Sequence, residues 1–387
     1  MRSFRVGSAF GIPLKLDVTF LLILPVFAYL IGTQVDVWVN TLNAAPFNAQ
    51  LDPGPLTDAP MRWYLGVAAA VGLFAAVVLH ELGHSVVAMH FGFPIDSITL
   101  WILGGIASFS EQPEEWSQEL LIAIAGPVVS VALGVLSLGA LWYLPASLDF
   151  ARFVFGYLSL MNFALAAFNM LPGFPMDGGR VLRALLARKR PFARATQIAA
   201  EVGKLFAIVL GIVGILGLNL ILIAIAFFIY IGASSEAQRT VMNAAFQDVQ
   251  VAEIMTSDVH TIDADASVAE LMERMFEERH TGYPVTRNGD VVGMVTLDDA
   301  RDVRPVERDA VLVEEIMTDD VYTIGESSNA MDALDAMQEH GVGRLVVTDD
   351  SGDMVGLVSR TDLMTAFNII QSTGTSAESP SLRASGG

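Results

Sequence analysis

The chain has 387 residues and a formal charge of −20 at pH 7, although 53% of its residues are hydrophobic, and one uniform domain would not combine these values. Residues 1–245 carry 14 acidic and 13 basic side chains (net −1) and residues 246–387 carry 28 acidic and 9 basic (net −19), which predicts a membrane domain followed by a soluble acidic domain. The acidic half argues against nucleic acid as a partner, and the absence of cysteine excludes disulfides and thiolate metal sites, so any metal must be held by imidazole and carboxylate groups.

The first element expected in the membrane half is a spanning helix. An apolar run begins after Pro13 and continues to about Thr33 without the small-residue cleavage site of a signal peptide. Residues 34–62 are polar and rich in Asp, Asn and Pro, which predicts an exposed loop. A second span is expected from about Trp63 to Phe91.

The second span contains the stretch His80-Glu81-Leu82-Gly83-His84 near its C-terminal end. Four residues is just over one helical turn, so His80 and His84 share a face and can hold one cation. In this HExxH pattern the two imidazoles hold zinc, and Glu81 would take a proton from the activated water and pass it to the leaving amine. A polar helix-packing cluster is the alternative. Ionisable groups at membrane depth cost roughly 2.5–3.5 kcal/mol each, which favours a functional site.

The remaining elements of the membrane half are a hairpin and four more spans. Residues 95–109 are β-branched and partly alternating around Gly104-Gly105, which predicts a short membrane-associated β-hairpin. This hairpin is either purely structural or a strand edge that holds an unwound substrate segment. Further spans are expected at 117–143 and 153–171, and two more lie within 195–244 on either side of a turn at Gly217-Leu218-Asn219. The sequence therefore predicts an α-helical membrane domain with six transmembrane helices.

A basic amphipathic helix from Gly178 to Arg190 sets the orientation of these spans. The segment between spans four and five carries six basic residues: Arg180, Arg183, Arg188, Lys189, Arg190 and Arg194. By the positive-inside rule this segment lies in the cytoplasm. Counting spans from it places the N-terminus, the hairpin and the C-terminal half in the cytoplasm as well, and residues 34–62 outside. The HExxH stretch and the exit of span four then approach the same inner face of a multi-pass cell-membrane protein.

A catalytic zinc needs three protein ligands and one open position. His90, the remaining histidine of the membrane half, is six residues past His84 and lies on the wrong face of the helix. Two prolines stop the fourth span, and glycines allow a sharp turn around Asp177. The turn can aim the Asp177 carboxylate back at the two histidines. The alternative is that Asp177 only caps the following helix.

The two motifs, residues 80–84 in one span and Asn169 to Arg180 (NMLPGFPMDGGR) after a later one, together resemble the site-2 protease family of intramembrane zinc metalloproteases. The zinc ligands of the family correspond here to His80, His84 and Asp177. The resemblance also implies that Glu81 is the general acid/base and that Asn169, which lies close to the metal in the family, steadies the tetrahedral oxyanion.

Two further polar residues of the membrane half receive no single role from the sequence. Asn162, nearly two helical turns before Asn169, either lines the same cleft or makes an interhelical hydrogen bond. Ser130 stands where many relatives have asparagine, so the resemblance assigns it no role.

A substrate helix must unwind before its backbone can be cut, and water must reach the metal from the cytoplasmic side because His84 lies nearer that end.

The C-terminal half contains a repeat. Residues 251–262 recur as residues 313–324, an offset of 62 residues, and each copy continues with an amphipathic helix and a strand pair. This half, residues 246–371, looks like an α/β tandem pair of CBS domains. The resemblance implies binding of an adenine nucleotide (AMP, ADP or ATP) in the cleft between the copies. The expected ribose contacts are Asp299 and Asp362, and the expected phosphate contacts are Thr296 and Ser359.

The acidic surface of this half opposes nucleotide binding. A net charge of −19 repels phosphates unless high salt screens it, although Arg344 and Arg360 can supply local positive charge. The whole chain has only three lysines, which resembles proteins of salt-loving archaea, with an ordinary acidic surface as the alternative. Residues 372–387 are rich in Ser, Gly and Thr and predict a disordered tail.

The sequence predicts an intramembrane zinc endopeptidase that cuts a transmembrane helix of a partner protein within the lipid bilayer. Its cytoplasmic CBS pair would sense nucleotide or mediate a homodimer. A CBS-regulated channel or transporter is one alternative, and it would spread charges over several spans, whereas here the deep charges concentrate at residues 80–84 and 177. A non-catalytic scaffold is the other, and it would have lost Glu81 or a ligand.

Overall fold

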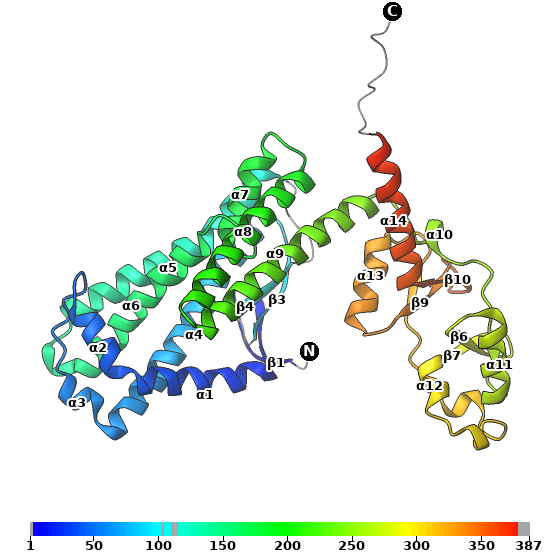
Figure 1. The fold of residues 1–387 in the computed structure, drawn as a ribbon, viewed down its shortest axis with the longest axis horizontal. Coiled ribbons are helices and arrows are strands. Elements are labelled where there is room, and N and C mark those ends of the chain that lie inside the picture. Colours follow the sequence, from blue (N-terminus) through cyan, green and yellow to red (C-terminus); the bar gives the residue numbers. More distant parts are fainter. Residues whose placement is uncertain (1–2, 102–103, 110–112, 114, 378–387) are drawn as a thin grey trace, which may run out of the picture. The chain divides into compact units, whose positions relative to one another are not determined.

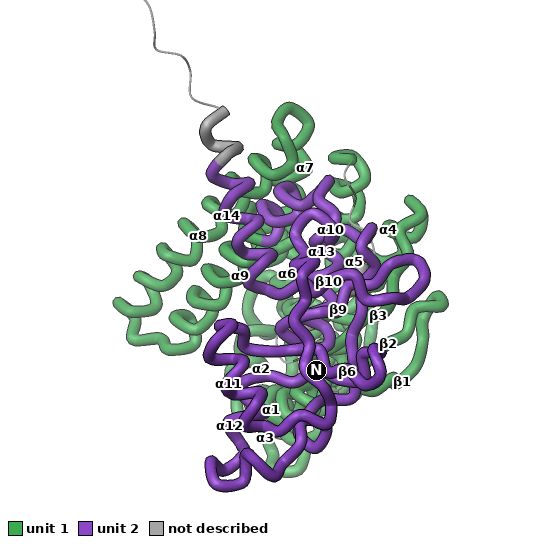
Figure 2. The backbone as a smooth tube through the Cα atoms, turned by 90° about the vertical axis from the view of Figure 1, so that its right-hand side faces the viewer, with its two compact units in different colours: residues 1–238 green, residues 239–387 purple. Residues whose placement is uncertain are grey.

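The computed structural model describes residues 3–377 except 102–103, 110–112 and 114. The chain divides into two compact units, Met1–Gln238 and Arg239–Gly387 (Figure 2). The boundary falls within helix α9 (Leu220–Phe246), seven residues before the boundary expected after residue 245.

The first unit is built mainly from long apolar helices (Figure 1). Among the described residues, five helices are long and apolar enough to cross a membrane: α4 (Ala59–His90), α5 (Trp116–Tyr143), α6 (Asp149–Asn169) with the preceding turn η1 (Ala146–Leu148), α8 (Phe192–Leu216) and α9. Helix α1 (Val18–Thr33) and α2 (Val35–Asn43) are bent by 64° and count as a sixth span only if taken together. The amphipathic helix α7 (Asp177–Ala187) precedes α8, and the turn between α8 and α9 lies at residues 217–219, where it was predicted.

The prediction of an exposed loop at residues 34–62 was wrong. This segment forms α2, α3 (Pro53–Thr57) and the start of α4. Val35, Val39 and Leu42 of α2 are buried in a core that includes Tyr157 of α6. These three residues follow the spacing of one helical face, and the Asp, Asn and Pro residues around them concealed this amphipathic pattern at the level of composition.

A four-stranded sheet accompanies these helices, in the order β1 (Ser3–Ala9), β2 (Ile12–Asp17), β3 (Ile95–Trp101) and β4 (Gly104–Phe109). The segment predicted as a hairpin contributes the antiparallel pair β3 and β4, while β2 joins β3 in parallel. Residues 13–17 are therefore strand rather than the start of the first span. Ile12 and Ile98 pack with Leu82 of α4, so the sheet lies against the helix that carries the HExxH stretch.

The second unit contains two copies of one motif. The first copy has a sheet in the order β5 (Ile262–Asp263), β6 (Gly282–Arg287) and β7 (Asp290–Thr296), with α10 (Val251–Ile254), α11 (Val268–Glu278) and α12 (Leu297–Arg301). The second has β8 (Thr323–Gly325), β9 (Arg344–Thr348) and β10 (Met354–Ser359), with α13 (Ala330–Glu339) and α14 (Arg360–Ala377). The turn η2 (Pro305–Glu307) lies between the copies, and η3 (Val313–Glu315) opens the second copy at the place that α10 has in the first.

The two copies exchange backbone bridges. Thr256 pairs with Leu357 of β10, and its repeat equivalent Thr318 pairs with Met294 of β7. The buried cores follow the same exchange: Val251 of α10 packs in the core of the second copy, and its repeat equivalent Val313 of η3 packs in the core of the first. A disordered tail was expected from residue 372, but α14 continues to Ala377; residues 378–387 lie outside the described residues. A helix already nucleated and packed through Phe367 extends at little cost, which explains the difference.

Candidate metal centre

The two histidines of the HExxH stretch converge on one point. His80 and His84 lie on the same face of α4, and each is 3% exposed. Their Nε2 atoms are 3.2 Å apart, and the two rings meet nearly edge to face. The helical spacing of four residues therefore brings two ring nitrogens to one place, as the sequence predicted.

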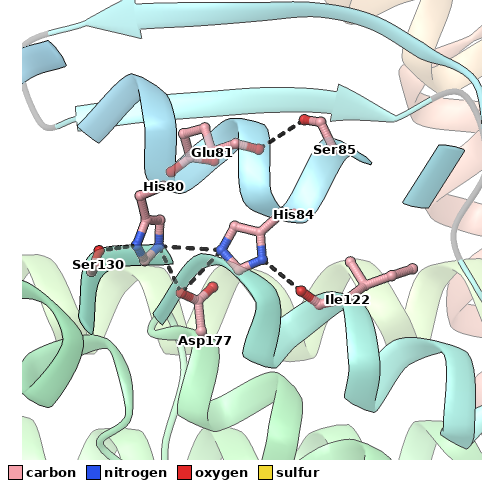
Figure 3. Close-up of polar contacts among 7 residues, drawn as sticks. All are labelled: His80, Glu81, His84, Ser85, Ile122, Ser130 and Asp177. Carbon is pink, nitrogen blue, oxygen red and sulfur yellow. Dashed lines mark hydrogen bonds and ion pairs between the residues drawn. The ribbon is translucent and has the colours of Figure 1, made fainter. Parts of the chain in front are cut away.

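Asp177 brings the third donor to the same point. Its Oδ2 atom lies 3.1 Å from His80 Nε2 and 3.2 Å from His84 Nε2 (Figure 3). Asp177 is the first residue of α7, but the helix is capped by Met176 and makes no side-chain cap hydrogen bond. The carboxylate thus faces the histidines, and the alternative in which it only caps α7 is not seen.

Glycines permit the turn that aims Asp177. A Cβ atom at Gly178 would lie 2.3 Å from the carbonyl oxygen of Leu171, and one at Gly179 would lie 2.5 Å from the backbone of Gly173. Non-bonded atoms do not approach so closely, so these two positions exclude larger residues. The chain can therefore fold back over the end of α6 and start α7 beside the histidines.

Helix α5 fixes both rings through their other nitrogens. His84 Nδ1 lies 2.7 Å from the carbonyl oxygen of Ile122, and His80 Nδ1 lies 2.8 Å from Ser130 Oγ (Figure 3). A carbonyl oxygen only accepts, so His84 Nδ1 carries the proton and its Nε2 lone pair is directed at the site. The sequence assigned no role to Ser130; a hydroxyl within an apolar span was the available signal.

The donor set fits a Zn²⁺ ion. The three atoms His80 Nε2, His84 Nε2 and Asp177 Oδ2 are separated by 3.1–3.2 Å. Zinc bonds of about 2.0–2.1 Å in a tetrahedron require donors about 3.3 Å apart. Gly126 of α5 keeps the space open, because a Cβ atom there would lie 2.2 Å from His84 Nε2 and 2.6 Å from His80 Nε2. The residues present therefore suit a metal with three protein ligands.

The metal centre opens into a cavity of about 640 Å³. The polar side chains that line it are His80, Glu81, His84, Asn169, Asp177, Arg180, Arg183 and Glu236. Both predicted catalytic residues, Glu81 and Asn169, thus border the same cavity as the donor atoms. The backbone of β4 approaches closely, since a Cβ atom at Gly105 would lie 2.6 Å from Glu81 Cγ.

Arg183 has a place that the sequence did not predict. It was counted only among the basic residues of a cytoplasmic segment, and the structure shows that its side chain is 4% exposed. The guanidinium binds Glu119 of α5 and donates from Nη1 to Glu236 of α9 over 2.8 Å. Its Cζ atom also lies 4.8 Å from the centroid of the Phe174 ring and 4.7 Å from that of Phe192. This ion pair ties three helices together beside the cavity.

Asn162 was expected either to line the cleft or to make an interhelical hydrogen bond, and the structure shows neither. Its side-chain amide donates to the carbonyl oxygen of Leu158 in its own helix over 2.8 Å, and it does not line the cavity. The buried oxygen of the same amide has no hydrogen-bond partner among the described residues.

The residues predicted to bind nucleotide form two equivalent pairs in the second unit. Thr296 Oγ1 donates to Asp299 over 2.6 Å, and Ser359 Oγ donates to Asp362 over 2.7 Å. The first pair caps α12 and the second lies at the start of α14. Arg344 of the second copy donates to Thr281 Oγ1 of the first over 3.1 Å, which places a cation between the copies.

Comparison with known proteins gives matches for both halves of the chain. Residues 68–149 and 146–210 match peptidase family M50, and residues 251–305 and 313–369 match the CBS domain. Over 369 residues the chain is 31% identical to a zinc metalloprotease of Methanocaldococcus jannaschii, covering 95% of this chain and 97% of that protein. It is 26% identical over 183 residues to stage IV sporulation protein FB of Bacillus subtilis, covering 44% of this chain and 62% of that protein. A solved site-2 protease structure from Methanocaldococcus jannaschii is 36% identical, with a TM-score of 0.43, and covers 61% of this chain and 95% of that chain.

Proposed function

Because this chain belongs to peptidase family M50, the site-2 proteases, and is a zinc metalloprotease, we propose that it cleaves peptide bonds within transmembrane segments of partner proteins. The observation that carries the proposal is the convergence of the buried His80 and His84 of α4, a helix long and apolar enough to cross a membrane, with the Asp177 carboxylate at the start of α7. Such a site serves a substrate that reaches it from the bilayer.

The residues of the metal centre have three different roles in hydrolysis. His80, His84 and Asp177 would hold the Zn²⁺, which supplies a Lewis acid that polarises the scissile carbonyl and lowers the pKa of the attacking water. Glu81 takes the proton from that water and passes it to the leaving amine. Asn169 donates its amide to the oxyanion of the tetrahedral intermediate.

Strand addition is the proposed way to present the substrate. A transmembrane helix hides its backbone in its own hydrogen bonds, so a segment must unwind before a carbonyl can reach the centre. β4 is the last strand in the sheet order, and its backbone at Gly105 lies against Glu81. An unwound segment paired with β4 would therefore run beside the catalytic carboxylate.

The proposed orientation keeps the centre near the cytoplasmic face. The exposed residues Lys189 and Arg190 between α7 and α8 support a cytoplasmic location for this segment, even without the buried Arg183. Water then enters from the cytoplasm, and the CBS pair lies on the same side of the membrane.

The CBS pair is proposed to regulate the protease by binding an adenine nucleotide between its copies, and a homodimer through the pair is the second candidate. Asp299 and Asp362 are the proposed ribose contacts, Thr296 and Ser359 the proposed phosphate contacts. Isothermal titration of the full chain with ATP should show binding that strengthens as salt screens the negative surface. Asp299→Ala and Asp362→Ala should each weaken it at least tenfold, and equal affinity in the variants would contradict the assignment.

The two alternative functions fit the described residues less well. A channel or transporter would spread buried charges along a path through several helices. Among the described residues of the first unit, the buried ionisable residues His80, His84, Glu119 and Arg183 instead gather at one cavity and its ion pair, and Asp17 caps α1. A scaffold would not need Glu81 together with three intact donors.

A cleavage assay with a matched variant tests the proposal. Glu81→Gln should retain zinc but abolish cleavage of a membrane-embedded test substrate in proteoliposomes, because the amide cannot accept a proton. Asp177→Ala should lose both zinc and cleavage. Unchanged cleavage by Glu81→Gln would remove Glu81 from its role. The same variant, purified from membranes, should retain natural substrates that can be identified by mass spectrometry.

A further inference from the structure

A second cluster of potential metal ligands lies in the first CBS copy, within the second unit. His260, Glu278 and His280 each offer one donor atom, and these atoms all lie within 4.8 Å of one another. Only three of the six histidines of the chain belong to this acidic half, and two of them meet at one carboxylate.

The local fold brings the three side chains together from two segments. His260 stands two residues before β5, and Glu278 is the last residue of α11. Arg279 adopts a left-handed conformation with φ of 59°, which ends the helix and turns the chain so that His280 returns to the side of Glu278. The cluster therefore joins the segment before β5 to the end of α11.

The geometry of the cluster allows a shared ion. His260 Nδ1 lies 3.0 Å from Glu278 Oε2, and His280 Nδ1 lies 4.0 Å from the same oxygen. The two rings are nearly perpendicular, with centroids 5.4 Å apart. The side chains of His260 and His280 are 42% and 48% exposed, so an ion can reach them from solvent and their rotamers can adjust.

A hydrogen bond from a buried tyrosine orients the Glu278 carboxylate. Tyr283, a fully buried residue of β6, donates its hydroxyl to Glu278 Oε2 over 2.7 Å. This hydrogen bond, followed by that from His260, keeps the pKa of the Glu278 carboxyl below its ordinary value. Ligating carboxylates are commonly oriented by such a second hydrogen bond.

The equivalent place in the second copy has a different chemistry. With the repeat offset of 62 residues, His260 and Glu278 correspond to Tyr322 and His340, and His280 corresponds to Val342. Tyr322 and His340 stack with their ring centroids 4.0 Å apart. The two positions thus touch in both copies, but only the first copy combines two imidazoles with a carboxylate.

We propose that His260, Glu278 and His280 bind a divalent transition-metal ion, with Zn²⁺ as the expected species, at a site separate from the catalytic centre. Two imidazoles and one carboxylate suit zinc and its neighbours, whereas Mg²⁺ and Ca²⁺ take oxygen ligands. A simple ion pair between His260 and Glu278 is the competing account, and it leaves His280 without a function at the cluster.

Metal analysis of the full chain tests the site without interference from the catalytic zinc. A variant with His80→Ala and His84→Ala, stripped with chelator and equilibrated with Zn²⁺, should retain about one zinc per chain by mass spectrometry. Adding His260→Ala should reduce the zinc content at least tenfold. Adding His340→Ala instead is the matched control, and it should leave the zinc content unchanged.

Cobalt gives a second readout that does not depend on stoichiometry. Co²⁺ added to the His80→Ala, His84→Ala variant should produce visible absorption of a nitrogen- and oxygen-ligated ion, and Glu278→Gln should abolish it. Hydrogen exchange of β6 in each variant checks that the first copy stays folded. The proposal is overturned if the double variant binds no zinc at millimolar concentration, or if His340→Ala lowers zinc as much as His260→Ala. Loss of activity in His80→Ala, His84→Ala has no bearing on this result.

Discussion

Replacing Gly126 by alanine should expel the catalytic zinc. A Cβ atom at this position would lie 2.2 Å from His84 Nε2 and 2.6 Å from His80 Nε2, the two nitrogens assigned to the metal. Non-bonded heavy atoms stay about 3.5 Å apart, so the rings must retreat by about 1 Å. Zinc sites tolerate deviations of only about 0.2 Å in their bond lengths. One added methyl group therefore removes two ligands at once.

The assay counts zinc in protein that carries His260→Ala, so that only the catalytic centre contributes. The matched control is Gly139→Ala, in the same helix α5, where a Cβ atom would meet nothing within 4 Å. Alanine favours helix over glycine by about 1 kcal/mol, so the control should keep its zinc and its thermal stability. Gly126→Ala should fall from about one zinc per chain to near zero and lose cleavage. Full zinc content in Gly126→Ala would refute the placement of α5 against the histidines.

Three further predictions concern the supports of the centre and its metal. Ser130→Ala removes the hydrogen bond to His80 Nδ1 over 2.8 Å and should weaken zinc binding by about 10–100-fold in a competition assay, while Ser130→Asn should restore most of it. Arg183→Ala leaves the buried Glu119 without its cation and should cost about 3–5 kcal/mol in the free energy of unfolding, whereas the exposed Arg190→Ala should cost less than about 0.5 kcal/mol. Removal of zinc with a chelator should abolish cleavage, and added Zn²⁺ should restore it; cleavage that survives chelation would contradict a metal-dependent reaction.

Local periodicity predicted the parts of the structure that depend on one segment. The spacing of His80 and His84 placed their rings on one face of α4, and the turn residues Gly217-Leu218-Asn219 marked the break between α8 and α9. The 62-residue repeat also predicted two copies in the C-terminal half, and each copy matches the CBS domain. Each of these features is visible as a pattern along the chain, so the sequence alone predicts it.

Features that depend on distant segments were not predicted. β2 pairs in parallel with β3, about 80 residues later in the chain, and short apolar stretches give no signal of such a partner. Arg183 was counted only as a cytoplasmic positive charge, and its ion pair was not predicted because its two partners, Glu119 and Glu236, lie on other helices. Asp177 was predicted as a ligand through the family resemblance, while its alternative as a helix cap was open from the residues alone.

Three residues on one face of α5 explain why the metal centre depends on both α4 and α5. Ile122, Gly126 and Ser130 recur every fourth residue, and the same spacing separates His80 from His84. Ile122 holds His84, Ser130 holds His80, and Gly126 leaves room between the two rings. The order of the contacting residues along α5 is therefore the reverse of the order of the two histidines along α4. A shift of one residue in the register between these helices would break both hydrogen bonds and bring Ala125 or Pro127, each of which has a Cβ atom, to the place of Gly126. The packing of α4 on α5 is therefore as necessary for metal binding as the ligands themselves.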